Sequence, residues 1–178
     1  MKTLKKGLAT LVLILSTMTH WAYAQEVEGL YVPFETTRTE LTPHLEKELK
    51  CLALNIYHEA GSEPYEGKLA VAQVSMNRAE SGKFPNTICG VVKQKSIWQG
   101  ATVCQFSWFC TAKSKMVQPL NSINYQESLA IARKVLLEGL ELTHLKDALY
   151  FHSRLVKPNW GKVRVAQIGN HIFYRDHR

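Results

Sequence analysis

The stretch LNIYHEAGSEPYEGK, Leu54–Lys68, joins the end of one predicted helix to the start of the next. The first helix is predicted to begin at Thr42 and Pro43, which are typical of an N-cap and a first helical turn. Its apolar residues then recur at helical spacing, at Leu45, Leu49, Leu52 and Ile56. Gly61 predicts the end of this helix, and Pro64 predicts the start of the following one.

Glu59 lies where the apolar stripe of the first helix requires another apolar residue. A carboxyl group there is partly desolvated and close to a helix C-terminus, and both effects raise its pKa. A carboxylic acid that stays protonated near neutral pH can act as a general acid. The alternative is structural: Glu59 pairs with Arg78 or Lys68, or reaches water beyond the helix end.

The other acids and the histidine in this stretch give weaker evidence of a catalytic or metal-binding role than Glu59 does. Glu63 and Glu66 fall at the start of the second helix, where acids complement the helix dipole, although Glu63 could also serve as a second carboxylate. His58 followed by Glu59 resembles the start of the HExxH zinc motif, but Ser62 occupies the place of its second histidine. We therefore predict neither a metal site nor a cofactor.

The second helix and the sequence beyond it complete the fold prediction. Apolar residues on both sides of the helix after Pro64 indicate that it is largely buried. Residues 97–115 mix aromatic and polar side chains without a period and predict an irregular loop held by cysteines. Asn124 and Glu127 resemble a capping box before a helix that Gly139 ends. Three strands are predicted last, in ALYFH, VRVAQI and HIFYR, so the fold class is α+β.

The first residues are typical of an exported protein. Residues 1–24 combine three lysines, a short apolar run and a small-residue cleavage site, and predict a signal peptide. The alternative, an uncleaved membrane anchor, is disfavoured because a spanning helix needs about 20 apolar residues. Residues 25–41 predict an extended lead-in, and residues 42–178 a single domain without stable membrane insertion.

Charge and cysteine content agree with export. Without the signal, which holds three of the 22 basic residues and none of the 15 acids, the net charge falls from +7 to about +4. This charge suits an anionic matrix such as a bacterial wall, and it is too small and dispersed to predict nucleic-acid binding. An even number of cysteines in an exported chain predicts two disulfides, with the pairing left open among Cys51, Cys89, Cys104 and Cys110.

Five segments occur in this order: CLALNIYHEAGSEPYEGKLAVAQVSMNR, FPNTICGVV, CQFSWFC, ALYFH and IGNHIFYR. Together they resemble the SleB-like cell-wall hydrolase family, which includes spore-cortex-lytic enzymes. The resemblance extends over residues 49–175. The resemblance implies a lysozyme-like catalytic domain that acts on peptidoglycan glycan strands, commonly as a lytic transglycosylase, with Glu59 as its catalytic glutamate. Two departures stand out: Gly61 and Ser62 replace the Arg and Gly of the family's EARGE, and Thr111 and Ala112 follow Cys110 where the family has CDG.

The implied mechanism needs one carboxyl group. Glu59 protonates the glycosidic oxygen between N-acetylmuramic acid and N-acetylglucosamine, and its carboxylate then accepts the proton of the sugar's 6-hydroxyl as an anhydro ring closes. Hydrolysis by a muramidase would need a second acid, for which Glu63 is the nearest candidate. An amidase and a non-catalytic wall-binding module are further alternatives; the amidase usually needs zinc.

Other side chains are candidates for substrate binding. Gln105 and Ser107 offer an amide and a hydroxyl on either side of Phe106, which could equally be a core residue. The side chains expected to line the cleft are Tyr150, His152, Asn77 and Glu63. Structural roles explain these residues about as well, and at most one tryptophan is expected to contact substrate. We expect a monomer located in the periplasm.

Overall fold

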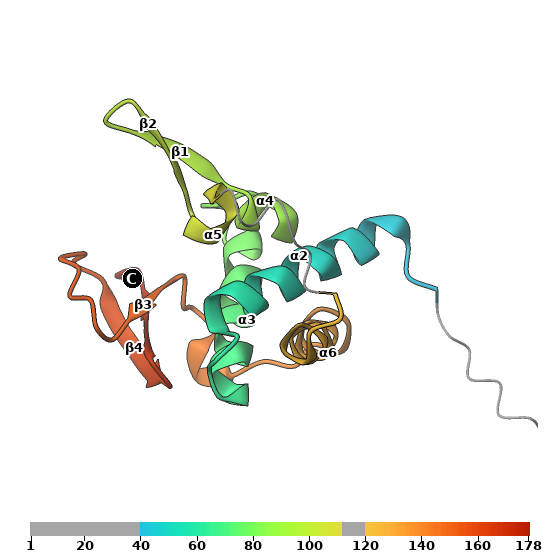
Figure 1. Cartoon of the computed structure of the whole chain (residues 1–178). Coiled ribbons are helices and arrows are strands. Elements are labelled where there is room, and N and C mark those ends of the chain that lie inside the picture. The colour runs from blue at the N-terminus through green and yellow to red at the C-terminus, as the bar shows by residue number, and fades with distance from the viewer. Residues whose placement is uncertain (1–39, 112–119) are drawn as a thin grey trace, which may run out of the picture. The chain divides into compact units, whose positions relative to one another are not determined.

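The computed structural model describes residues 40–111 and 120–178 (Figure 1). The predicted signal peptide and nearly all of the predicted lead-in lie outside the described residues. Residues Leu41–Arg178 form one compact unit. Within the described residues, no helix is long and apolar enough to cross a membrane.

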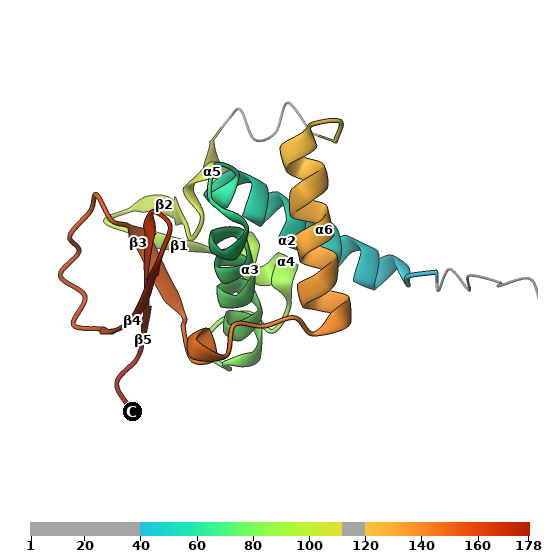
Figure 2. The same ribbon diagram turned by 90° about the horizontal axis from the view of Figure 1, so that it is seen from below.

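Three long helices build the core. They are α2 (Pro43–Ala60), α3 (Tyr65–Glu80) and α6 (Ile123–Glu138), and α2 contacts both of the others. Thr42 Oγ1 accepts a hydrogen bond from Leu45 N, which confirms the predicted N-cap of α2. Helix α3 is largely buried, as predicted. Figure 2 shows the three helices on one side and strands β3 to β5 on the other.

The segment predicted as an irregular loop is more regular than expected. It contains a hairpin of β1 (Lys95–Trp98) and β2 (Ala101–Cys104), followed by the short helix α5 (Ser107–Cys110). The prediction was wrong because nearly all hairpin side chains are exposed, so the sequence carries no alternation of apolar and polar residues. The short helix α4 (Ile88–Val92) precedes this hairpin.

The start of α6 also differs from its prediction. The helix begins two residues earlier than a capping box at Asn124 would place it, with Ser122 as the N-cap residue. Glu127 does not cap this end; its carboxylate accepts a hydrogen bond from Lys68 Nζ of α3. Gly139, in the left-handed conformation, ends the helix as predicted.

The C-terminal sheet is antiparallel with strand order β3-β5-β4, which confirms the α+β prediction. Its strands are β3 (Tyr150–Ser153), β4 (Val163–Ile168) and β5 (His171–Arg175), preceded by the 3-10 helix η3 (Thr143–Leu145). Phe173 is fully buried and packs with core residues of α3. Gly169, in the turn between β4 and β5, has a φ of +57°, and a Cβ there would overlap with Glu63 Oε2.

Two disulfides complete the framework and settle the pairing. Cys51 of α2 is bonded to Cys89 of α4, across 38 residues of sequence. Cys104 is bonded to Cys110, only 6 residues away, and this small loop encloses Phe106 and α5. The first bond therefore joins two core helices, whereas the second shapes a local loop.

The difference in loop length predicts a difference in stabilisation. Chain entropy alone gives about 4 kcal/mol for closing the long loop and about 2 kcal/mol for the short one. We expect the Cys51→Ala/Cys89→Ala variant to lose more stability than the matched Cys104→Ala/Cys110→Ala control. Urea unfolding monitored by circular dichroism measures both. Equal losses would contradict the structural distinction between the two bonds.

Candidate active site

Glu59 lies in the last turn of α2 and is half-buried. Burial raises the pKa of its carboxyl group to about 7, and the positive charge of Arg78 partly opposes this shift. A pKa near 7 leaves a large share of Glu59 protonated at neutral pH, as predicted for a general acid. Its carboxyl group makes no hydrogen bond or ion pair with another of the described residues.

Arg78 ends α3 in the same region, and its side chain is 3% exposed. Its guanidinium carbon lies 5.0 Å from the centre of the Phe84 ring and 5.3 Å from that of Phe106. Arg78 Nε donates a hydrogen bond of 2.7 Å to the backbone oxygen of Leu149, just before β3. Burial lowers the pKa of Arg78 to about 10, which still leaves it charged at neutral pH.

Trp108 of α5 fixes the aromatic loop beside Glu59. Its ring stacks on that of His58, with centres 4.3 Å apart, and its Nε1 donates to Asn55 Oδ1 in the buried face of α2. This contact places Phe106 in the core, where it meets Arg78. The flanking residues of the predicted substrate site, Gln105 and Ser107, are exposed.

Four aromatic side chains form a continuous group on the C-terminal sheet, which we call the aromatic platform: Tyr150, His152, Trp160 and Tyr174. His152 Nε2 lies 2.9 Å from the hydroxyl of Tyr174, and the two rings are stacked. The Trp160 ring contacts the other three rings and is 43% exposed. The Tyr150 ring also lies 6.2 Å from the ring of Phe84, which Arg78 contacts, so the platform reaches the surroundings of Arg78.

Glu63 has a structural role that its position in the sequence does not reveal. Its two carboxylate oxygens accept hydrogen bonds from the backbone N and the side-chain Nδ2 of Asn170, in the turn between β4 and β5. Burial raises the pKa of Glu63, but these hydrogen bonds and the nearby charges of His171 and Arg154 outweigh it and hold the pKa below its ordinary value. Glu63 therefore anchors the hairpin, and neither the second-carboxylate nor the helix-dipole interpretation describes these contacts.

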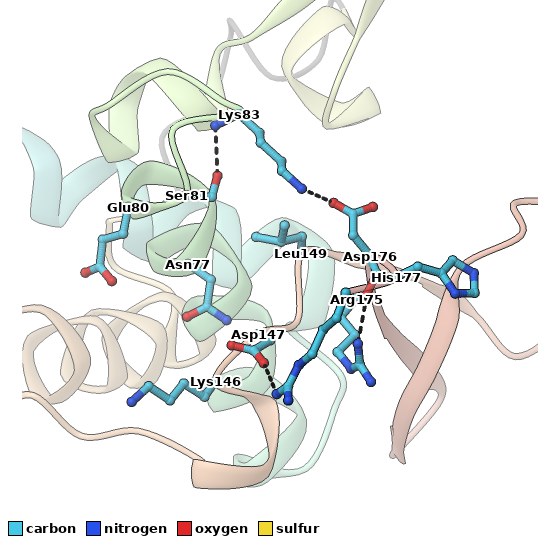
Figure 3. Close-up of a pocket in the computed structure, with 11 residues that line it drawn as sticks. Asn77, Glu80, Ser81, Lys83, Lys146, Asp147, Leu149, Arg175, Asp176 and His177 are labelled. Atoms are coloured by element: carbon cyan, nitrogen blue, oxygen red, sulfur yellow. Dashed lines mark hydrogen bonds and ion pairs between the residues drawn. The ribbon is translucent and has the colours of Figure 1, made fainter.

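The side-chain amide of Asn77 is bound to the backbone of its own fold. Its Nδ2 donates to the backbone oxygens of Leu145 and Ala148, so the donors that would orient a substrate carbonyl are already used. Asn77 lines a pocket of about 470 Å³ whose lining does not include Glu59 (Figure 3). Charged side chains surround this pocket and pair across it, as in Lys83 with Asp176 and Arg178 with Asp147. We do not assign the pocket to the site.

Neither Arg78 nor Tyr174 was predicted from the sequence to be a functional residue. For Arg78 a pattern was available, because it falls on the same helical face as Val71 and Val74, where an apolar residue is expected. No comparable pattern points to Tyr174. It contacts His152 only because strand β3 pairs with strand β5. Within the described residues, no group of three or more His, Cys, Asp or Glu side chains is arranged to hold a metal ion.

Comparison with known proteins identifies the family. The model of the cell wall hydrolase family matches residues 62–174, more than half of the chain. The chain belongs to the cell wall hydrolase family. The matched range begins just after Glu59 and includes Arg78, the aromatic loop and the C-terminal sheet up to Tyr174, one residue before the end of β5.

Relatives of this cell wall hydrolase include two spore cortex-lytic enzymes. That of Halalkalibacterium halodurans is 40% identical over 132 residues, 72% of this chain and 34% of the relative. That of Bacillus subtilis is 28% identical over 130 residues, 71% of this chain and 37% of the relative. The chain therefore aligns with well under half the length of these curated relatives.

Solved structures show the same fold. The catalytic domain of the Bacillus cereus SleB protein is 26% identical, with a TM-score of 0.53 over 73% of this chain and 91% of that one. The catalytic domain of the germination-specific lytic transglycosylase SleB from Bacillus anthracis is 24% identical, with a TM-score of 0.56 over 77% of this chain and 98% of that one. The cell wall hydrolase fold predicted from the motifs is confirmed.

The raised pKa of Glu59 predicts a pH-dependent stability. Because its pKa is higher in the folded protein than its ordinary value of 4.5, the protonated form stabilises the fold at low pH, and this contribution is lost as pH rises from about 4.5 to about 7. Relative to Glu59→Gln, the wild type should lose about 3 kcal/mol between pH 4 and pH 8. Urea unfolding of both proteins at the two pH values measures this difference. Glu66→Gln, at an exposed position of α3, is the matched control, and an equal change in both variants would contradict the assignment.

Proposed function

We propose that this protein cleaves the glycan strands of peptidoglycan between N-acetylmuramic acid and N-acetylglucosamine, with Glu59 as the general acid. The observation that carries the proposal is the half-buried carboxyl group of Glu59, whose pKa of about 7 keeps a transferable proton near neutral pH. Membership of the cell wall hydrolase family supports a wall substrate. The curated relatives are named for lysis of the spore cortex, which agrees with it.

The proposed reaction is that of a lytic transglycosylase. Glu59 gives its proton to the glycosidic oxygen, the bond to the sugar's C1 breaks, and the electron pair stays on the leaving oxygen. The resulting Glu59 carboxylate takes the proton of the 6-hydroxyl as that oxygen bonds to C1. One carboxyl group therefore serves both steps, and the product carries a 1,6-anhydro ring.

The position of Glu63 favours this route over hydrolysis by a muramidase. A two-carboxylate mechanism needs a second acid free to act as a base or nucleophile across the scissile bond. Both oxygens of Glu63 are instead bonded to Asn170, and Arg78 is the charged residue that acts on Glu59. The charge around Glu59 is therefore positive, which supports a mechanism with a single carboxyl group.

The aromatic platform and the aromatic loop are proposed to bind the glycan. Trp160 offers an exposed ring for a sugar face, while Gln105 and Ser107 offer exposed polar groups on either side of Phe106. Arg154 and Lys157, between β3 and β4, are exposed and suit the anionic groups of peptidoglycan, whereas Lys162 in the same segment pairs with Asp176. We further propose that the protein is exported to the periplasm and acts there as a monomer, and its two disulfides support export.

Muropeptide analysis tests the reaction. Purified peptidoglycan is incubated with the protein or with Glu59→Gln, and soluble products are identified by mass spectrometry. We expect anhydro-muramyl products from the wild type and a loss of at least about 100-fold in the variant, because the amide cannot donate the proton. Glu66→Gln is the control and should retain activity.

Other products would contradict parts of the proposal. Reducing-end sugars would show hydrolysis and refute the transglycosylase route. Released peptides with intact glycan would show an amidase. Binding to the wall without release of any product would indicate a wall-binding module.

Substitution of Trp160 tests the aromatic platform. Trp160→Ala removes the exposed ring, so the glycan concentration for half-maximal rate should rise about tenfold, the equivalent of about 1.4 kcal/mol. The maximal rate should change little, because Glu59 is untouched. Trp98→Ala is the matched control, since Trp98 is 68% exposed on the β1–β2 hairpin. An unchanged half-maximal concentration in Trp160→Ala would exclude the ring from substrate binding.

A further inference from the structure

The pocket of about 470 Å³ lies between the end of α3, the segment before β3 and the end of β5 (Figure 3). Its lining is polar apart from Leu149, and it includes four Lys or Arg side chains and three Asp or Glu side chains. The volume is that of a typical site for a small ligand. The lining suits a ligand that carries charges of both signs rather than an apolar one.

Two of the three acids in this pocket are neutralised by the protein itself. Asp147 pairs with Arg178. Asp176 pairs with Lys83 and with Lys162. These two carboxylates therefore offer little net charge to a ligand.

Two cations and one acid of the pocket remain without a charged partner among the described residues. The side chain of Lys146 makes no hydrogen bond or ion pair with any of them, and that of Glu80 makes none either. The Arg175 guanidinium donates only to the backbone oxygen of Asp176, at 3.0 Å. The pocket can therefore compensate two negative charges and one positive charge of a ligand.

The pocket shares a wall with the aromatic platform. The Tyr150 hydroxyl donates a hydrogen bond of 3.3 Å to Asp176 Oδ2, which lines the pocket. Lys162 Nζ, which pairs with the same carboxylate, lies 4.2 Å from the centre of the Tyr150 ring. The exposed ring of Trp160 lies beside Tyr150, with ring centres 6.3 Å apart. A ligand with a sugar on the platform can therefore extend past Asp176 into the pocket.

We propose that this pocket binds the stem peptide of peptidoglycan, the short peptide attached to N-acetylmuramic acid. The inference rests on the proposed function, because it takes peptidoglycan as the substrate. A stem peptide carries carboxylates and, at its diamino acid, an amino group. The carboxylates match Lys146 and Arg175, and the amino group matches Glu80. Because the peptide is attached to a sugar of the strand, an N-acetylmuramic acid bound on the platform brings its peptide to the pocket.

Binding of the free stem peptide tests the pocket without any need for cleavage. The peptide is released from purified peptidoglycan by an amidase, and its affinity is measured by calorimetry at low salt. We expect a loss of about threefold in each of Lys146→Ala, Arg175→Gln and Glu80→Gln, as for an exposed ion pair, and of about tenfold in Lys146→Ala/Arg175→Gln. Lys93→Ala is the matched control and should bind like the wild type, since it removes one charge from an exposed lysine at the end of α4.

A second measurement asks whether the pocket acts during cleavage. Soluble glycan strands are compared with the same strands after an amidase has removed their peptides. The wild type should reach half its maximal rate at about a tenfold lower concentration of the peptide-bearing strands. Lys146→Ala/Arg175→Gln should lose this preference while its rate on peptide-free strands is unchanged. A variant that is merely damaged would be slower on both substrates.

The outcomes separate this inference from the proposed function. A wild type that cleaves both substrates equally well, or a preference that survives in Lys146→Ala/Arg175→Gln, would overturn the peptide site and leave the reaction standing. Inorganic phosphate that binds as tightly as the peptide, with no effect of Glu80→Gln on either, would overturn it too and indicate a simple anion site. A wild type that cleaves neither substrate but binds the free peptide with the expected losses in the variants would refute the reaction and support the peptide site.

Discussion

The site depends on two ionisable groups, a carboxyl group and a guanidinium cation, that the protein keeps from full hydration. The buried stripe of α2 ends on Glu59, and that of α3 ends on Arg78. Neither group is fully hydrated, so the ionisation of each depends on the other more than it would in water. The two phenylalanine rings and the Leu149 oxygen hold the cation in the last turn of α3.

The parts around this pair are held by contacts distant in sequence. Cys51–Cys89 joins α2 to α4, and the hydrogen bond from Trp108 to Asn55 joins the aromatic loop to α2. Phe106 can therefore contact the guanidinium although its loop is short and largely exposed. The groups proposed to bind substrate and the proposed acid come from different elements on one framework, as in enzymes that combine a rigid core with variable loops.

Local patterns predicted the helices and the last strands well, because residues such as Thr42, Gly61 and Gly139 act on their own neighbours. The partly buried position of Glu59 was predictable for the same reason, because Glu59 interrupts a regular stripe of apolar residues on its own helix. The β1–β2 hairpin was not, since exposure on both faces removes the alternating pattern. The contacts of Glu63 with Asn170 were not predictable, because the two residues lie 107 positions apart and no local rule connects them.

The sheet is attached to the helices at two separate places. Arg78 holds the chain where it enters β3, and Glu63 holds the turn between β4 and β5. Two attachments still permit rotation about the line that joins them, and the packing of Phe173 against α3 opposes that rotation. The proposed glycan substrate must then adapt its own torsions to a surface that moves little. Such a surface can engage a long, cross-linked strand at an internal bond without first wrapping around it.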